Sequence, residues 1–193
     1  KVHSSAATLA NALDKLGFQQ TNTAFFDTIV VKADAQKIRT IAEQNEVNFY
    51  YIDANTVSIS LNETTSIADL NAIVGIFASA NNTQATTIEA LTETNHFPEN
   101  LSRTSSFLQH DVFNKYHSET ALMRYIKMLE RKDLALNHSM ISLGSCTMKL
   151  NAAAEMLPLS NPQWNNIHPF VPLEQAQGYQ EMLTKLEQQL NVI

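Results

Sequence analysis

Proline is confined to the C-terminal part of this 193-residue chain and limits how regular that part can be. All five prolines follow residue 95, and four of them fall between positions 158 and 172. Proline fixes its own φ angle and has no amide hydrogen, so it interrupts helix interiors and central strands. The sequence therefore predicts short helices and long irregular stretches here, as in an arm that wraps another body of structure.

Other residue types divide the chain at the same place. All six methionines and five of the six histidines also follow residue 95. Residues 1–95 hold ten acidic and five basic side chains, whereas residues 96–193 hold nine and eight. This shift predicts a boundary near residues 94–98, with a small α+β domain over 1–95 and a mainly helical arm over 96–193.

The first part has the hydrophobic spacing of alternating helices and strands. Val57, Ile59 and Leu61 alternate with serines, which predicts a half-buried strand. The predicted elements, in order, are a helix capped by Ser4 or Ser5 and ended by Gly17, a strand at 28–31, a helix capped by Asp34, strands at 47–52 and 57–61 joined by a turn at 53–55, a helix opened by Thr65 or Ser66, and a weaker helix from Asn82 to Leu91. The order predicts a small two-layer α/β sandwich.

The second part predicts two longer helices. Ser118 can cap the first, which carries Leu122 and Ile126 on one face. The last begins near Leu173 and carries Tyr179 and Leu186 on its apolar face. We expect the exposed apolar faces around Leu122, Met128 and Leu183 either to pair between copies of the chain or to be poorly ordered.

Composition narrows the possible functions. A formal net charge of -6 argues against nucleic-acid binding, which usually needs a basic surface. The single cysteine excludes an internal disulfide framework and suits a reducing compartment. The chain lacks an apolar run long enough to predict a membrane span. It starts without methionine and has no visible helix stop at its end, so we expect a piece of a longer protein.

The run from His138 to Asn151 carries the most chemistry. It combines small polar residues, the only cysteine, a glycine and a lysine, and it leads into the helix-like segment 152–156. Hydroxyls and amide groups of Ser145 and Thr147 could hold an anionic or polar group, with Lys149 adding positive charge. In the alternative interpretation, which the residue types alone favour, Cys146 is a packed core residue and Lys149 is solvated.

More specific chemistries lack support in the sequence. Cys146 could be a nucleophile only with a base such as His138 or His168 nearby, and nothing fixes those distances. A zinc site would need closely spaced pairs of cysteine or histidine, which are absent. A Schiff base on Lys149 would need a desolvated amine. The segment 164–172, with Trp164 and His168, is interpreted as a rigid packing loop in preference to a ligand wall.

Four separated motifs together resemble one family. They are the segments 107–120, 138–151, 166–170 and 175–182, which occur in this order and read FLQHDVFNKYHSET, HSMISLGSCTMKLN, NIHPF and QAQGYQEM. This set resembles the P-protein of the glycine cleavage system, and the match is specific over about residues 103–193. Residues 1–95 are compatible with the small domain that ends the first half of that family's chain.

The resemblance implies a piece of a fold-type I, pyridoxal-phosphate-dependent enzyme. Such an enzyme decarboxylates glycine and passes the aminomethyl group to the lipoyl arm of H-protein, alongside the other glycine cleavage components. The family's Schiff-base lysine lies in a histidine-lysine motif that is absent here, and Lys149 does not match it. The piece is therefore expected to be inactive alone and to bind no cofactor itself, with no catalytic or metal-binding residue assigned.

The resemblance also predicts which residues line the active site and in which cellular compartment the protein lies. The residues expected to line the active-site entrance of the longer protein are Ser145, Cys146, Thr147, Lys149, Asn151 and His168. The implied location is the bacterial cytoplasm, or the mitochondrial matrix in a eukaryote. A different class of function is left open, namely a non-catalytic module that binds a small molecule or acts as a scaffold.

Overall fold

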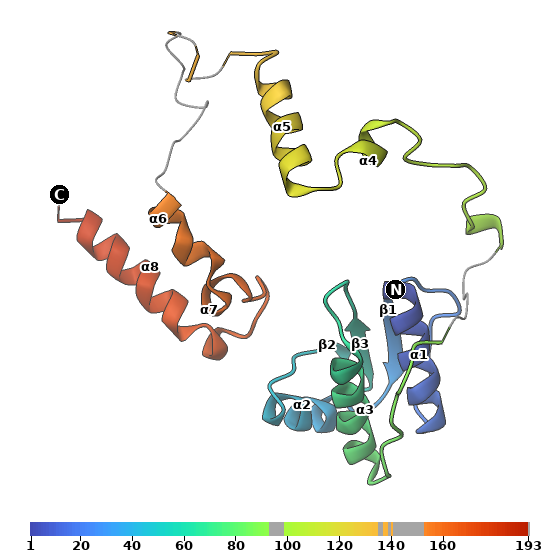
Figure 1. The fold of residues 1–193 in the computed structure, drawn as a ribbon. Helices are drawn as coiled ribbons and strands as arrows, with labels where there is room; N and C mark the ends of the chain where they lie inside the picture. The colour runs from blue at the N-terminus through green and yellow to red at the C-terminus, as the bar shows by residue number, and fades with distance from the viewer. Residues whose placement is uncertain (93–98, 135–136, 139, 141–152, 193) are drawn as a thin grey trace. The chain divides into compact units, whose positions relative to one another are not determined.

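The computed structural model describes residues 1–92, 99–134, 137–138, 140 and 153–192 (Figure 1). The chain divides into two compact units, Lys1–Thr104 and Ser105–Ile193, and each is considered by itself. The first unit combines helices with one small sheet, which agrees with the predicted α+β character.

The sheet of the first unit has three antiparallel strands in the order β1-β3-β2. They are β1 (Thr28–Lys32), β2 (Tyr50–Asp53) and β3 (Thr56–Ser60). The predicted hairpin is confirmed, because β2 and β3 pair across the turn at 54–55. Strand β2 begins at Tyr50, three residues later than predicted. Ser58 is only 8% exposed, so the prediction of a half-buried β3 was wrong for this residue: β3 is the central strand, and its neighbours β1 and β2 flank Ser58.

Three helices build the core with this sheet: α1 (Val2–Lys15), α2 (Ala35–Gln44) and α3 (Ile67–Asn81). Helix α3 packs against both other helices, and α1 also packs against β1. Phe77 of α3 is fully buried, with its ring edge-on to Phe18 at 4.9 Å and tilted against Phe49 at 5.7 Å. The other large side chains with under 2% exposure are Leu9, Leu13, Ile29, Val31, Ile38, Val57, Ile59, Leu70, Val74 and Ile76.

Most predicted helix ends of the first unit are confirmed. Asp34 caps α2 by accepting the Lys37 amide hydrogen at 3.0 Å. Gly17 follows the end of α1 with a φ of +88°, a conformation that favours glycine after a helix. The predicted cap at Ser4 or Ser5 was wrong, because α1 already begins at Val2. Ser5 is 1% exposed within the helix, at the start of a run of buried residues that continues with Ala6, Ala7 and Leu9.

The predicted helix from Asn82 to Leu91 was also wrong, because residues 83–89 form no regular element. Asn82 adopts a left-handed conformation that ends α3, with φ 53°. The Asn71 side chain then holds Ile88 through two hydrogen bonds, accepting its amide hydrogen at 2.8 Å and donating to its carbonyl at 3.0 Å. Ile88 is 8% exposed, so an extended segment seals the core where a helix was expected.

The second unit is helical and open. Ser118 caps α5 by accepting the Ala121 amide hydrogen at 3.2 Å, as predicted, whereas the last helix starts at Gln177 and not near Leu173. No side chain is buried among the residues of this unit whose burial the structure describes. Its α-helices are α4 (Val112–Lys115), α5 (Glu119–Glu130), α6 (Ala153–Met156), α7 (Pro162–Asn165) and α8 (Gln177–Leu190). Short 3-10 turns lie at η1 (Glu99–Leu101, in the first unit), η2 (Leu157–Ser160) and η3 (Leu173–Gln175).

Ser66 and Asp69 form a reciprocal cap at the start of α3. The Ser66 hydroxyl accepts the Asp69 amide hydrogen at 3.2 Å, and the Asp69 carboxylate accepts the Ser66 amide hydrogen at 2.8 Å. Replacing Ser66 with alanine should lower the free energy of unfolding of the first unit by about 1 kcal/mol. Urea denaturation followed by circular dichroism measures this, and Thr86→Ala, at an exposed position of the irregular segment, serves as the control. Equal stabilities of the two variants would contradict the cap.

The same cap predicts a loss of stability in acid. The Ser66 hydroxyl and amide groups hold the pKa of Asp69 below its ordinary value. A lowered pKa means that the stabilisation is complete above the ordinary aspartate pKa, about 3.9, and is lost as the pH falls through the folded-state value. Between pH 7 and pH 3, Asp69→Asn should therefore lose less stability than the unmodified chain. An identical loss in both chains would show that Asp69 does not contribute.

Candidate functional site

Most residues predicted to line an active-site entrance lie outside the described residues. Ser145, Cys146, Thr147, Lys149 and Asn151 belong to this group, so their role stays a prediction. Of the predicted lining residues, His168 alone falls within the described part of the chain. The geometry that can be built is therefore that of the segments on either side of the run 138–151.

His168 lies in the proline-rich segment after α7. Its side chain is exposed, and its Nδ1 accepts the Phe170 amide hydrogen at 3.1 Å. Its backbone carbonyl accepts the Val171 amide hydrogen at 3.0 Å, and its ring lies 5.8 Å from the Phe170 ring. A neutral ring that accepts at Nδ1 carries its hydrogen on Nε2. The histidine therefore closes a tight turn through its Nδ1 atom and its backbone carbonyl.

An aromatic contact joins α7 to the start of α8. The Trp164 and Tyr179 rings meet edge-on, with centroids 5.4 Å apart, and the Tyr179 hydroxyl donates to the Trp164 carbonyl. Gln180 Nε2 donates to the Leu173 carbonyl at 2.7 Å and ties η3 to the same helix. An open cavity of about 270 Å³ lies beside this contact. It is lined by Gln163, Trp164, Ile167, Gln175, Ala176, Gly178 and Tyr179.

This contact gives the segment 164–172 the packing role that its sequence favoured. The cavity offers aromatic faces and amide groups, a surface for a planar or polar group rather than for a charged one. His168 is not among its lining residues. The structure therefore does not bring His168 into this cavity. Sequence patterns did not predict the Trp164–Tyr179 pairing, because the two residues are fifteen positions apart.

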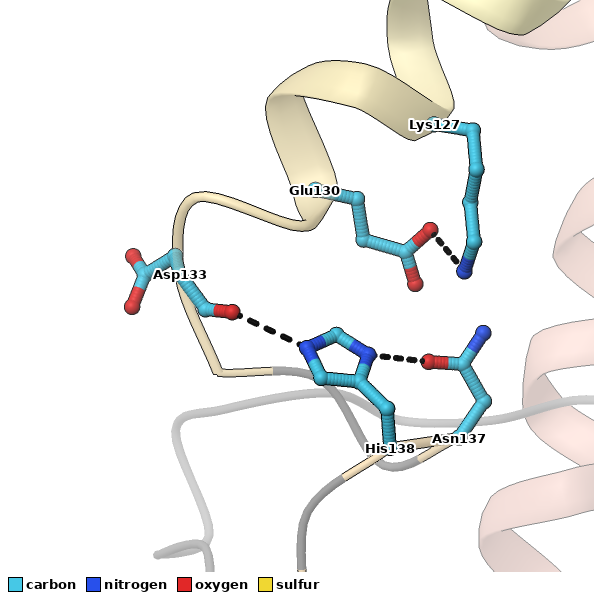
Figure 2. Close-up of polar contacts among 5 residues, drawn as sticks. All are labelled: Lys127, Glu130, Asp133, Asn137 and His138. Atoms are coloured by element: carbon cyan, nitrogen blue, oxygen red, sulfur yellow. Dashed lines mark hydrogen bonds and ion pairs between the residues drawn. The ribbon is translucent and has the colours of Figure 1, made fainter.

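A polar cluster lies at the C-terminal end of α5, where the run 138–151 begins (Figure 2). Lys127 Nζ lies 2.5 Å from Glu130 Oε2, and His138 lies within hydrogen-bond distance of Asn137 and of the Asp133 backbone. The hydrogen bond from Lys127 is the main cause that lowers the pKa of Glu130. The Glu130 carboxylate therefore stays ionised to a lower pH than an ordinary glutamate. His138, the first residue of the run 138–151, belongs to the same cluster.

Another polar groove, of about 470 Å³, lies in the first unit between the start of α2 and the β2–β3 turn. The Arg39 guanidinium lies 4.3 Å from the centroid of the Tyr51 ring, and burial raises the pKa of the Tyr51 hydroxyl. Asp53 lines the same groove, and the Asn55 amide hydrogen, at 2.7 Å, lowers its pKa. Sequence patterns did not indicate this groove, because neither Tyr51 nor Arg39 belongs to a recognisable site motif.

The described residues also bear on metal binding and on membrane spanning. In the described part of the chain, no group of three or more histidine, cysteine, aspartate or glutamate side chains could hold a metal ion. Among the same residues, every helix is too short or too polar to cross a membrane.

Tyr179 shields Trp164, the only tryptophan of the chain, which is 40% exposed. An edge-on aromatic pair contributes about 0.5–1.5 kcal/mol beyond its area burial. Replacing Tyr179 with alanine should therefore expose the indole and shift its fluorescence emission to longer wavelength, whereas Tyr179→Phe should keep the emission nearly unchanged. Tyr116→Ala, which removes a ring stacked on Tyr125 in the same unit, is the matched control. An unshifted emission in Tyr179→Ala would rule out the pairing.

Comparison with known proteins places the chain among relatives of one kind. The family model of the glycine cleavage system P-protein matches residues 1–77. Over 193 residues the chain is 71% identical to glycine dehydrogenase (decarboxylating) of Flavobacterium johnsoniae, covering all of this chain and 20% of that protein. The corresponding protein of Christiangramia forsetii is 61% identical over 192 residues, covering 100% of this chain and 20% of that protein. The mitochondrial protein of Solanum tuberosum is 45% identical over 189 residues, covering 96% and 18%. The chain thus spans about a fifth of the length of these curated relatives.

Proposed function

Because the chain belongs to the glycine cleavage system P-protein family over the segment that it spans, we propose that it is part of a glycine dehydrogenase (decarboxylating). The observation that carries this proposal is the 71% identity to such an enzyme along the whole chain. The four ordered motifs between residues 107 and 182 support it independently. The proposed reaction of the full-length enzyme is the decarboxylation of glycine, followed by transfer of the aminomethyl group to the lipoyl arm of H-protein.

The family implies pyridoxal phosphate as the cofactor, which would supply an electron sink for the carbanion left by decarboxylation. The described residues do not fit this group. Lys185 lines an open cavity along α8, where its side chain is exposed and paired with Glu181 at 2.5 Å. A Schiff-base lysine needs a desolvated amine instead. We therefore assign cofactor binding to other parts of the full-length enzyme and expect this chain alone to be inactive.

The run 144–151 is proposed to line the entrance of the active site in the full-length enzyme. Ser145, Thr147 and Asn151 would donate or accept hydrogen bonds, Lys149 would add positive charge, and Cys146 would lie close by. His168 would complete the set from the proline-rich segment. Support for this comes from residue chemistry and from the polar cluster that holds the start of the run at His138.

Thr147 is the most direct test of this proposal. In a full-length enzyme that contains this segment, Thr147→Ala should lower glycine turnover about tenfold, the effect of losing one hydrogen bond near 1.4 kcal/mol. Thr147→Ser, which keeps the hydroxyl, should retain most of the turnover. The exchange of the glycine carboxyl carbon with bicarbonate measures both. Unchanged kinetics of Thr147→Ala would exclude a direct role for this hydroxyl.

A non-catalytic binding module is the second candidate function. The groove between α2 and the β2–β3 turn, with Arg39, Tyr51 and Asp53, is the observation that favours it. Such a groove could bind a small polar molecule without any reaction. The exchange of the glycine carboxyl carbon with bicarbonate distinguishes the two functions. A longer chain that contains this segment should catalyse this exchange only if the enzyme proposal holds.

A further inference from the structure

The irregular segment 83–92, here called the strap, is attached to two helices that lie far apart in the sequence. Figure 1 shows the chain turning after α3 and running back beside α1 and α3. Along the way Ile88 bonds to Asn71, near the start of α3, and Thr92 bonds to Thr8 of α1. Because α1 and α3 pack against each other, the strap bridges one joined pair of helices.

Side chains of the two helices hold the middle and the end of the strap. The Asn71 side chain accepts the Ile88 amide hydrogen at 2.8 Å and donates to the Ile88 carbonyl at 3.0 Å. The Thr8 hydroxyl, on a residue that is 6% exposed, accepts the Thr92 amide hydrogen at 2.8 Å and donates to the Ser4 carbonyl at 2.7 Å. These two side chains replace the backbone partners that a strand or a helix would give the segment.

The strap buries little apolar surface of its own. Ile88 is its buried residue, and Leu91 is partly buried against the same core, whereas the other residues of the strap are exposed. The helix beneath it is anchored far more firmly, because Leu70, Val74 and Phe77 of α3 are all fully buried. A segment with few buried contacts opens at a lower free energy than the core on which it lies.

We propose that the strap is a latch that opens from α1 and α3 as one unit while the sheet and the three helices stay folded, with Asn71 and Thr8 as its two catches. Opening removes Ile88 from the core and releases residues 83–92. Ten released residues can span up to about 33 Å, at about 3.3 Å per residue. The latch therefore sets the length of the connection that leads from this core to the second unit. This inference does not depend on the proposed enzyme function.

Amide hydrogen exchange of the isotopically labelled 193-residue chain, followed by nuclear magnetic resonance, tests the latch. The Ile88 and Thr92 amides should have similar protection factors, at least about tenfold below those of the best-protected amides in the central strand β3. Asn71→Ala should accelerate exchange at Thr92, which bonds to Thr8 and not to Asn71, at least about tenfold. Thr8→Val, which keeps the side-chain shape without the hydroxyl, should accelerate exchange at Ile88 by a similar factor.

Thr86→Ala, at an exposed position of the strap, is the matched control and should leave both protection factors unchanged. Two results would overturn the proposal. One is an acceleration that stays confined, in each variant, to the amide that lost its acceptor. The other is protection of the Ile88 and Thr92 amides equal to that of β3, because the strap would then open only with the whole unit. This second comparison uses the unmodified chain, so it decides even where a variant weakens the entire fold.

Discussion

The packing of α3 against the sheet and the two other helices is the constraint on which the first unit depends. Phe77 is completely buried, and its ring contacts Phe18 and Phe49 from two other parts of the chain. Burying a side chain of this size stabilises a fold by several kcal/mol, more than any cap or surface pair here can supply. Val57 and Ile59 of the central strand β3 belong to the same buried core as Phe77.

The second unit lacks an equivalent constraint in the residues whose burial is described. Its order comes from local contacts: a serine cap on α5, the pairing of Trp164 with Tyr179, and the turn around His168. Leu122 and Ile126 on α5, and Leu183 and Leu186 on α8, remain about half exposed. Apolar faces of this kind normally become buried against another surface, which agrees with a segment that spans a fifth of its relatives' length.

Short sequence signals predicted where helices begin and end better than they predicted how many helices there are. Asp34, Ser66, Ser118 and Gly17 were recognised because a cap depends on one residue and its near neighbours. The expected helix at 82–91 failed because Asn71, eleven or more positions away, captures the backbone of Ile88. At the candidate site, sequence motifs selected the run 138–151 and His168, but residue types could not reveal that Arg39 would lie over Tyr51 or that Trp164 would pair with Tyr179.

The sequence by itself determined the family, the alternation of helices and strands, the capping residues and the change in character after residue 95. These features depend on composition, periodicity and short motifs, all of which are local. The tertiary structure alone decided that Ser58 of the central strand β3 is buried, and that an irregular segment held by Asn71 closes the core beside α3. Such contacts join residues that are distant in sequence or depend on side-chain orientation, and neither property is written in residue order.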